Sequence, residues 1–293
     1  MEIKLRNRRT ALRGFTLIEL VVVLVVLVAL AGVLVPLMPN MITRSHSASG
    51  STSMQEAAKA IQMFEALNFS QPDGWDSLVQ ADGQTLRADR FTVVELAPGP
   101  VDGDGNSPGD PGYDPDDIAN QDQIDLASRI STALNTAGIR TSFTMADGIQ
   151  GNGRPEGHSN APSARINTFS PYAGDLTAFE DLTENGRVVT LGPALNELNR
   201  FGFLDPDSDP TTVAYVAFGI GERLNAIGKT ISAAPVHFPE AGDLPPTQKY
   251  SRFAAIYRIP TAGPAELAAV AAVHGDHFDS LNQHLQEFYE TTE

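Results

Sequence analysis

One stretch of the chain, residues 101–117, is rich in carboxylates and could bind a cation. It reads VDGDGNSPGDPGYDPDD and holds six aspartates and no basic residue. Calcium takes its oxygen ligands from alternating Asp and Asn side chains, and Asp102, Asp104 and Asn106 provide such a beginning. The stretch is not an EF-hand, because Ser107 stands where that loop needs its invariant glycine. Calcium is therefore a candidate cofactor, and a solvated acidic loop is the alternative.

Two further groups of side chains could hold a metal ion. They are the acidic group Asp205, Asp207 and Asp209, and the C-terminal group His274, Asp276, His277, Asp279 and His284. Histidine together with carboxylate is a zinc-binding combination. No H-E-x-x-H pattern is present, however, and solvated histidines or helix caps are the alternative for the C-terminal group.

Enzyme motifs are incomplete throughout the chain. Residues 105–109 fit the letters G-x-S-x-G, but that motif needs a strand before its serine and a helix after it, whereas an aspartate-glycine loop precedes this serine and Pro108 follows it. The glycine pairs in GIQGNGRPEG and FGIGERL complete no phosphate-binding pattern. The absence of cysteine excludes thiol catalysis and zinc-thiolate sites. We therefore expect no enzyme.

The charge of the chain is divided unevenly along it. The formal net charge is −16, yet residues 1–14 carry five basic residues against one acid, Glu2. The residues after Gly14 hold 15 basic and 35 acidic side chains. Contacts to phosphates require clustered Lys and Arg, so we expect no nucleic-acid partner.

An apolar run follows the basic leader. Residues 15–38 contain one charged residue, Glu19, and as a helix they would extend roughly 36 Å, which is enough to cross a bilayer. The basic leader predicts a cytoplasmic N-terminus and export of everything after the helix. The run is too long for a secretory signal peptide, and no small-x-small cleavage site follows it. An uncleaved signal anchor is one interpretation of this pattern.

The residues around Glu19 add a resemblance. The sequence Arg13-Gly14-Phe15-Thr16-Leu17-Ile18-Glu19 resembles the prepilin-peptidase recognition segment of type IV pilins and type II secretion pseudopilins. Pro36, the twenty-second residue from Phe15, stands where such proteins often carry a helix-kinking proline. The resemblance covers residues 1 to about 67.

This resemblance implies a processing and assembly scheme. Prepilin peptidase would cleave between Gly14 and Phe15, and the new amine of Phe15 would be methylated. Glu19 would pair with the N-terminal ammonium of a neighbouring subunit, because a lone carboxylate in an apolar bundle is costly. The implied partners are prepilin peptidase, other copies of the chain, other pilin-like subunits and a membrane-embedded assembly machinery. The implied location is the bacterial inner membrane, with one membrane span, a cytoplasmic N-terminus and an exported head, and then a filament.

The resulting domain plan has four parts. Residues 1–14 are a leader, 15–38 the transmembrane half of a long helix, 39–68 its amphipathic half and 69–293 an exported head. Pro36 predicts a kink, and Gly50, within a small and polar stretch, predicts a flexible joint. After it, apolar residues recur at helical spacing at Met54, Ala57, Ala58, Ile61, Phe64 and Leu67.

The head mixes strand and helix patterns. Short runs with β-branched or aromatic residues predict strands at 91–96, 141–145, 187–191, 213–218 and 253–259. Helices are predicted at 123–137, 193–201, 265–273 and 276–289. The expected fold class is α+β, with a pilin-like long N-terminal helix packed on a globular head that contains an antiparallel sheet.

The function expected from these features is that of a non-enzymatic filament subunit, in a type IV pilus-like fibre or a type II secretion pseudopilus. The alternative is a signal-anchored exported binding or enzymatic domain that does not polymerise.

Overall fold

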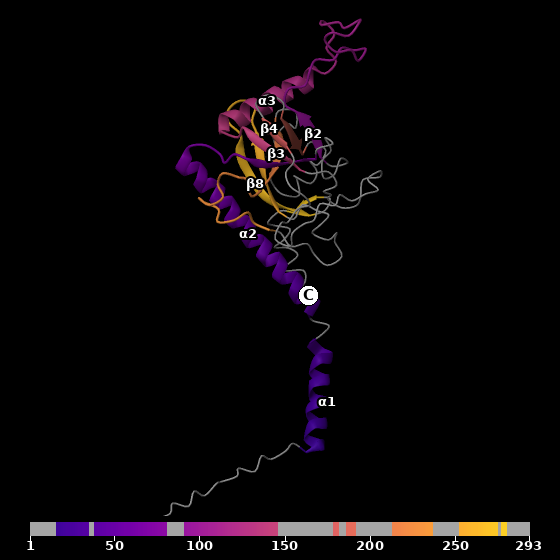
Figure 1. The fold of residues 1–293 in the computed structure, drawn as a ribbon, viewed down its shortest axis with the longest axis vertical. Helices are drawn as coiled ribbons and strands as arrows, with labels where there is room; N and C mark the ends of the chain where they lie inside the picture. Colours follow the sequence, from indigo (N-terminus) through magenta and orange to yellow (C-terminus); the bar gives the residue numbers. More distant parts are fainter. Residues whose placement is uncertain are drawn as a thin grey trace, which may run out of the picture.

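The structure is a computed structural model. It describes residues 16–34, 38–80, 91–145, 178–181, 186–191, 213–236, 252–274 and 277–279. Within them the helices are α1 (Leu17–Leu34), α2 (Met38–Asn68) and α3 (Gln121–Ala137). The described strands are β1 (Trp75–Gln80), β2 (Thr92–Glu95), β3 (Thr141–Met145), β4 (Ala178–Asp181), β5 (Arg187–Thr190), β6 (Ala214–Gly219), β7 (Phe253–Ile259), β8 (Glu266–His274) and β9 (His277–Asp279) (Figure 1).

The N-terminal segment forms two helices instead of the single long helix that we predicted from the sequence. α1 ends at Leu34 and α2 begins at Met38. The predicted kink residue, Pro36, lies outside the described residues. Proline has no N–H to donate to the carbonyl four residues earlier, so a helix that contains a proline lacks one backbone hydrogen bond there. α2 then runs through Gly50 without a break, and the flexible joint predicted there is wrong.

The predicted fold class is wrong in its long, pilin-like N-terminal helix. Within the described residues, no helix is both long enough and apolar enough to cross a membrane. The 18 residues of α1 extend only about 27 Å, whereas the sequence argument took residues 15–38 as one helix. The predicted antiparallel sheet is found for most of the described strand pairs, and among these pairs only β1 and β3 pair in parallel.

The sheet is built around β6 and β7. The strand order is β4-β3-β1-β6-β7-β8-β9, and β5 pairs with both β6 and β2. The predicted strands at 91–96, 141–145, 187–191, 213–218 and 253–259 are confirmed as β2, β3, β5, β6 and β7, and the predicted helix at 123–137 is confirmed as α3.

Two predicted helices are strands where the structure describes them. Residues 266–273 of the first fall on β8, which pairs along β7, and residues 277–279 of the second form β9. Alanine favours helices, so the alanine-rich sequence ELAAVAAVH indicated the wrong structure, and pairing with β7 overrides that preference. The rest of 276–289 and the predicted helix at 193–201 lie outside the described residues.

Both faces of the central strands are buried. Along β7, Phe253, Ala255, Tyr257 and Ile259 join a core shared with α2 and α3, and the alternating residues join a second core on the opposite face. α2 lies beside β8 (Figure 1). The sheet is therefore a two-sided layer, with α2 and α3 packed on one face.

Three aromatic rings lie at the centre of the core shared with the helices. The Trp75 ring centroid is 6.0 Å from that of Phe218 and 5.6 Å from that of Tyr257. The indole N–H of Trp75 donates to the carbonyl of Pro72 at 2.7 Å, and the Tyr257 hydroxyl donates to Oε1 of Gln71 at 3.1 Å. Burial raises the pKa of Tyr257 well above its ordinary value, so the phenol stays protonated. These contacts fix the chain where α2 passes into β1.

Gly74, immediately before β1, should tolerate no side chain. Its φ is +86°, and an added Cβ would lie 2.7 Å from the carbonyl oxygen of Arg223. Gly228 has a similar φ of +76°, but an added Cβ there would meet nothing within 4 Å. We expect Gly74→Ala to lower the free energy of unfolding by about 2–3 kcal/mol and Gly228→Ala by about 1 kcal/mol, measured by urea unfolding. Equal losses would show that the close backbone approach does not matter.

Candidate functional site

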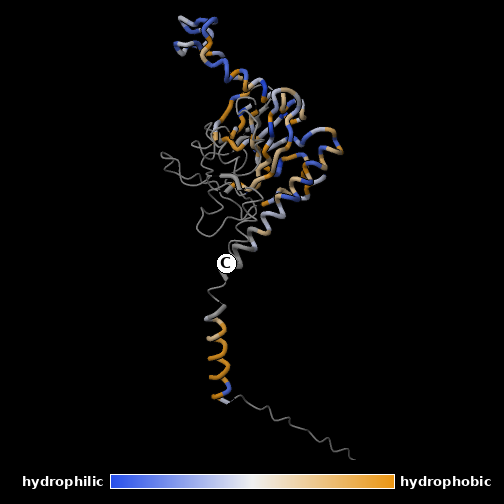
Figure 2. The backbone as a smooth tube through the Cα atoms, turned by 180° about the vertical axis from the view of Figure 1, so that it is seen from behind, coloured by the Kyte–Doolittle hydropathy of each residue, from blue (hydrophilic) through white to orange (hydrophobic). Residues whose placement is uncertain are grey.

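α1 presents apolar side chains to the outside on every side. Its large hydrophobic residues from Leu17 to Leu30 are exposed by between 46% (Val21) and 81% (Leu17). Figure 2 shows the helix as hydrophobic over nearly its whole length. A helix that is apolar all round is stable only in apolar surroundings. α1 therefore needs a partner or a medium that the described head does not provide.

The first turn of α1 is closed by a reciprocal cap between Thr16 and Glu19. The backbone N–H and the hydroxyl of Thr16 donate to Oε2 of Glu19 at 2.8 and 2.9 Å. The N–H of Glu19 donates in return to the Thr16 hydroxyl at 3.3 Å. This is a capping box, in which the acid also faces the positive end of the helix dipole. The charge of Glu19 is thus accommodated within its own helix.

The two predicted processing residues, Gly14 and Phe15, lie outside the described residues. Phe15 directly precedes Thr16 in the chain, so its backbone nitrogen is one residue from the capping box. The sequence analysis predicted a role in assembly for Glu19. It did not identify the hydrogen bonds to Thr16, although T-L-I-E fits the S/T-x-x-E pattern of a capping box.

The carboxylate of Asp102 accepts several hydrogen bonds within the acidic loop at residues 101–117. Asp102 is only 3% exposed, and its Oδ1 accepts hydrogen bonds from the N–H groups of Asp104 and Asn106 at 3.1 and 2.7 Å. Its Oδ2 accepts from the side-chain amide of Asn106 at 3.3 Å and from the N–H of Asp114 at 3.0 Å. One carboxylate therefore ties together residues on both arms of the loop.

These bonds favour the ionised form of Asp102. The N–H of Asn106 has the largest effect and lowers the pKa of Asp102, and the other donors act in the same direction against the effect of burial. The predicted calcium ligands Asp102, Asp104 and Asn106 thus lie close together. They are joined by hydrogen bonds in which Asp104 and Asn106 donate and the carboxylate of Asp102 accepts. Within the described residues no three His, Asp or Glu side chains are grouped so as to hold a metal ion. Calcium binding stays a prediction.

The other predicted metal groups are described only in part. Asp205, Asp207, Asp209, Asp276 and His284 lie outside the described residues. His274 and His277 are opposite each other where β8 turns into β9, and Asp279 is opposite Ala272. Strand pairing thus places opposite each other two histidines, of which the sequence analysis had assigned only His277 to a helix.

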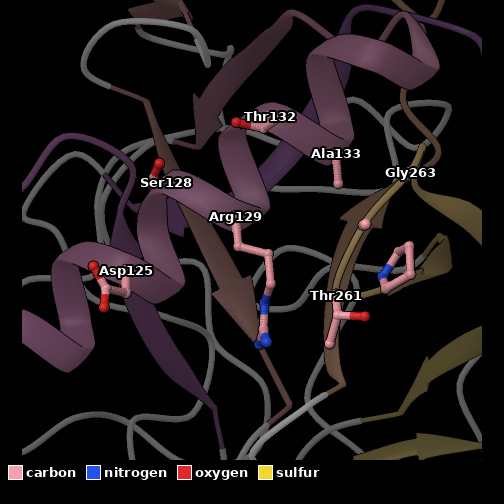
Figure 3. A pocket seen from close by; sticks show the side chains of 9 residues that line it. Asp125, Ser128, Arg129, Thr132, Ala133, Thr261 and Gly263 are labelled. Atoms are coloured by element: carbon pink, nitrogen blue, oxygen red, sulfur yellow. The ribbon is translucent and has the colours of Figure 1, made fainter.

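A pocket that the sequence did not predict lies between α3 and the turn that joins β7 to β8. Its volume is about 380 Å³. Side chains of α3 and residues of the turn line it: Asp125, Ser128, Arg129, Thr132, Ala133, Pro260, Thr261, Ala262 and Gly263 (Figure 3). The polar residues at 125, 128, 129 and 132 recur at the spacing of one helix face. This spacing is the sequence signal from which the α3 wall of the pocket could have been predicted.

The network around Asp102 predicts a pH-dependent stability. Because its folded pKa lies below the unfolded value of 3.8, the stabilisation is complete above that value and is lost as pH falls through the folded pKa. We expect Asp102→Asn to lower Tm by roughly 3–8 °C at pH 7 and by progressively less below pH 4, measured by calorimetry. Asp104→Asn, at an exposed position, is the matched control. A Tm difference between wild type and Asp102→Asn that is independent of pH would contradict this origin.

Comparison of the chain with protein-family models, with curated proteins and with solved structures found no match. The functional interpretation therefore depends on the residues and geometry described above.

Proposed function

We propose that the chain is a non-enzymatic structural subunit of a filament, either a type IV pilus-like fibre or a type II secretion pseudopilus, and that it assembles through α1. The observation that carries this proposal is a helix whose apolar side chains are exposed all round and whose one charged residue, Glu19, lies in its first turn. The G-F-T-L-I-E segment at residues 14–19 supports the same function through its resemblance to prepilin processing sites.

Packing of α1 against copies of itself would provide a large driving force. Complete burial of a Val or Leu side chain is worth about 1.5–3 kcal/mol, and the helix exposes such residues from Leu17 to Leu30. Part of this gain is offset by the entropy lost on association. Before assembly, the same surface would keep the subunit associated with the bacterial inner membrane, where prepilin peptidase and the assembly machinery act.

Glu19 would set the axial register of the bundle. All the hydrogen bonds described for its carboxylate fall on Oε2. A second cationic or donor partner is then needed when the carboxylate enters apolar surroundings, because a partly satisfied buried charge is costly. The methylated amine of Phe15 on a neighbouring subunit would be that partner, and the cap to Thr16 would hold the carboxylate ready for it.

Processing at Gly14 gives the first test. We expect the mature chain to begin at N-methylated Phe15, as measured by mass spectrometry of the protein from its native host. Gly14→Val should leave an unprocessed N-terminus, because a branched side chain would occupy the cleavage site, whereas Ala11→Val in the leader should be processed normally. A wild-type chain that keeps Met1 would refute the proposal and favour an anchored domain that does not polymerise.

Two substitutions distinguish the effect of the charge of Glu19 on assembly from the effect of its helix cap. Glu19→Gln keeps an acceptor for the N–H of Thr16 but cannot form an ion pair, and Thr16→Ala weakens the cap but keeps the charge. We expect Glu19→Gln to reduce incorporation into filaments by about tenfold and Thr16→Ala to have a smaller effect, measured by immunoblotting of sheared filaments. The reverse order would show that helix capping is what assembly requires.

A further inference from the structure

One short motif of the chain has no part in the assembly scheme proposed for α1. Asn68, Phe69 and Ser70 read N-F-S, and among the asparagines of the chain only Asn68 has a serine or threonine two residues later. N-x-S is the pattern at which carbohydrate is attached to asparagine in exported proteins, provided that the middle residue is not proline. Such a short motif has meaning only where the fold presents it, so its position must be considered.

The motif lies where α2 ends. Asn68 is the last residue of the helix and is exposed, and Figure 1 shows this end of α2 at the outer edge of the head. The backbone of Phe69 has a φ of +55°, a left-handed conformation that ends the helix, and its N–H donates to the carbonyl of Glu65 at 2.8 Å. The motif therefore lies in an exposed turn, where a transferase can reach the Asn68 side chain.

The side-chain amide of Asn68 can carry a sugar without losing its contact with α2. Its Nδ2 donates a hydrogen bond to the carbonyl of Phe64 at 2.8 Å. A primary amide has two N–H groups, and a glycosidic bond replaces one of them. The other can keep the bond to Phe64, so the attachment is compatible with the end of the helix as it stands.

Apolar side chains next to Asn68 are exposed. Phe69 is 94% exposed, Leu67 62% and Met63 56%. Met63 and Leu67 are four residues apart and therefore lie on one face of α2. Clustered exposed apolar side chains usually mark a surface that another group covers. A hydroxyl-rich glycan on Asn68 would be attached directly beside this cluster.

We infer that Asn68 is a site of N-linked glycosylation and that the attached glycan covers the exposed side chains of Met63, Leu67 and Phe69. The donor is a lipid-linked oligosaccharide pyrophosphate, used by a transferase on the exported side of the membrane. Nδ2 of Asn68 forms a bond to the anomeric carbon of the first sugar and loses one proton. The bond from that carbon to the phosphate oxygen breaks, and the pyrophosphate leaves with the electron pair. The inference rests on one part of the proposed function, the export of the head.

Mass spectrometry of the full-length protein from its native host tests the site. The peptide that contains Asn68 should be heavier by the mass of a glycan. Asn135, which is exposed on α3 but is followed two residues later by Ala137, is the matched control and should be unmodified. Ser70→Ala should abolish the added mass although Asn68 is retained, and Ser70→Thr should preserve it, because serine and threonine both complete the motif.

The same spectra separate this inference from the proposed function. An unmodified Asn68 in a chain that begins at N-methylated Phe15 would overturn the inference and leave the proposed function standing. A glycan on Asn68 in a chain that keeps Met1 would support the inference, because it needs only export of the head, and would refute the proposed function.

The covering role of the glycan has its own test in assembled filaments. Ser70→Ala lacks the glycan but keeps Phe69, so binding of a hydrophobic fluorescent dye should rise by about twofold relative to wild type. Adding Phe69→Ser should return dye binding toward the wild-type level, because it removes the most exposed of the three apolar side chains. Equal dye binding by wild type and Ser70→Ala would show that the glycan does not cover the cluster and would overturn that part of the inference.

Discussion

The architecture of the head depends on the packing of α2 against the sheet. α2 buries one stripe, made of Met54, Ala57, Ile61 and Phe64, in the core that contains the Trp75 ring. Together with α3, this stripe shields from water the face of the central strands on which their aromatic residues lie. α1 has no such stripe, because its apolar residues surround the helix. α2 thus buries its apolar stripe on the sheet of its own chain, whereas α1 needs an apolar partner or medium from outside.

The carboxylates of Glu19 and Asp102 are stabilised in the same way. Glu19 and Asp102 each accept hydrogen bonds from nearby N–H groups of their own segment. This arrangement stabilises the charge and orders the local backbone, at a helix start in one case and in a long loop in the other. At Glu19 the fixed negative charge can then select a cationic partner, which is the physical basis of the contact proposed between α1 helices of neighbouring subunits.

Strands with β-branched and aromatic residues could be predicted, because their alternation and turn signals are local. β7 is an example, and the helix α3 could likewise be predicted from a local pattern. β1 could not be predicted, since WDSLVQ contains Asp76 and Ser77, which disfavour strands, and it pairs with β3 and β6 from distant parts of the chain. The pocket between α3 and the β7–β8 turn, which Arg129 lines, could not be predicted from the sequence for a related reason. Its two walls, α3 and the turn after β7, lie far apart in the sequence.

The sequence by itself determined the acidic character of the chain, the apolar N-terminal run with Glu19 in it and the aspartate-rich loop. These are local properties of composition and spacing. Only the tertiary structure decided that the alanine-rich residues of β8 form a strand, that Asp102 turns inward while its neighbours face solvent, and that Arg129 stands in a pocket. Each of these results depends on hydrogen bonds or packing between residues that are not adjacent, and no local pattern encodes such contacts.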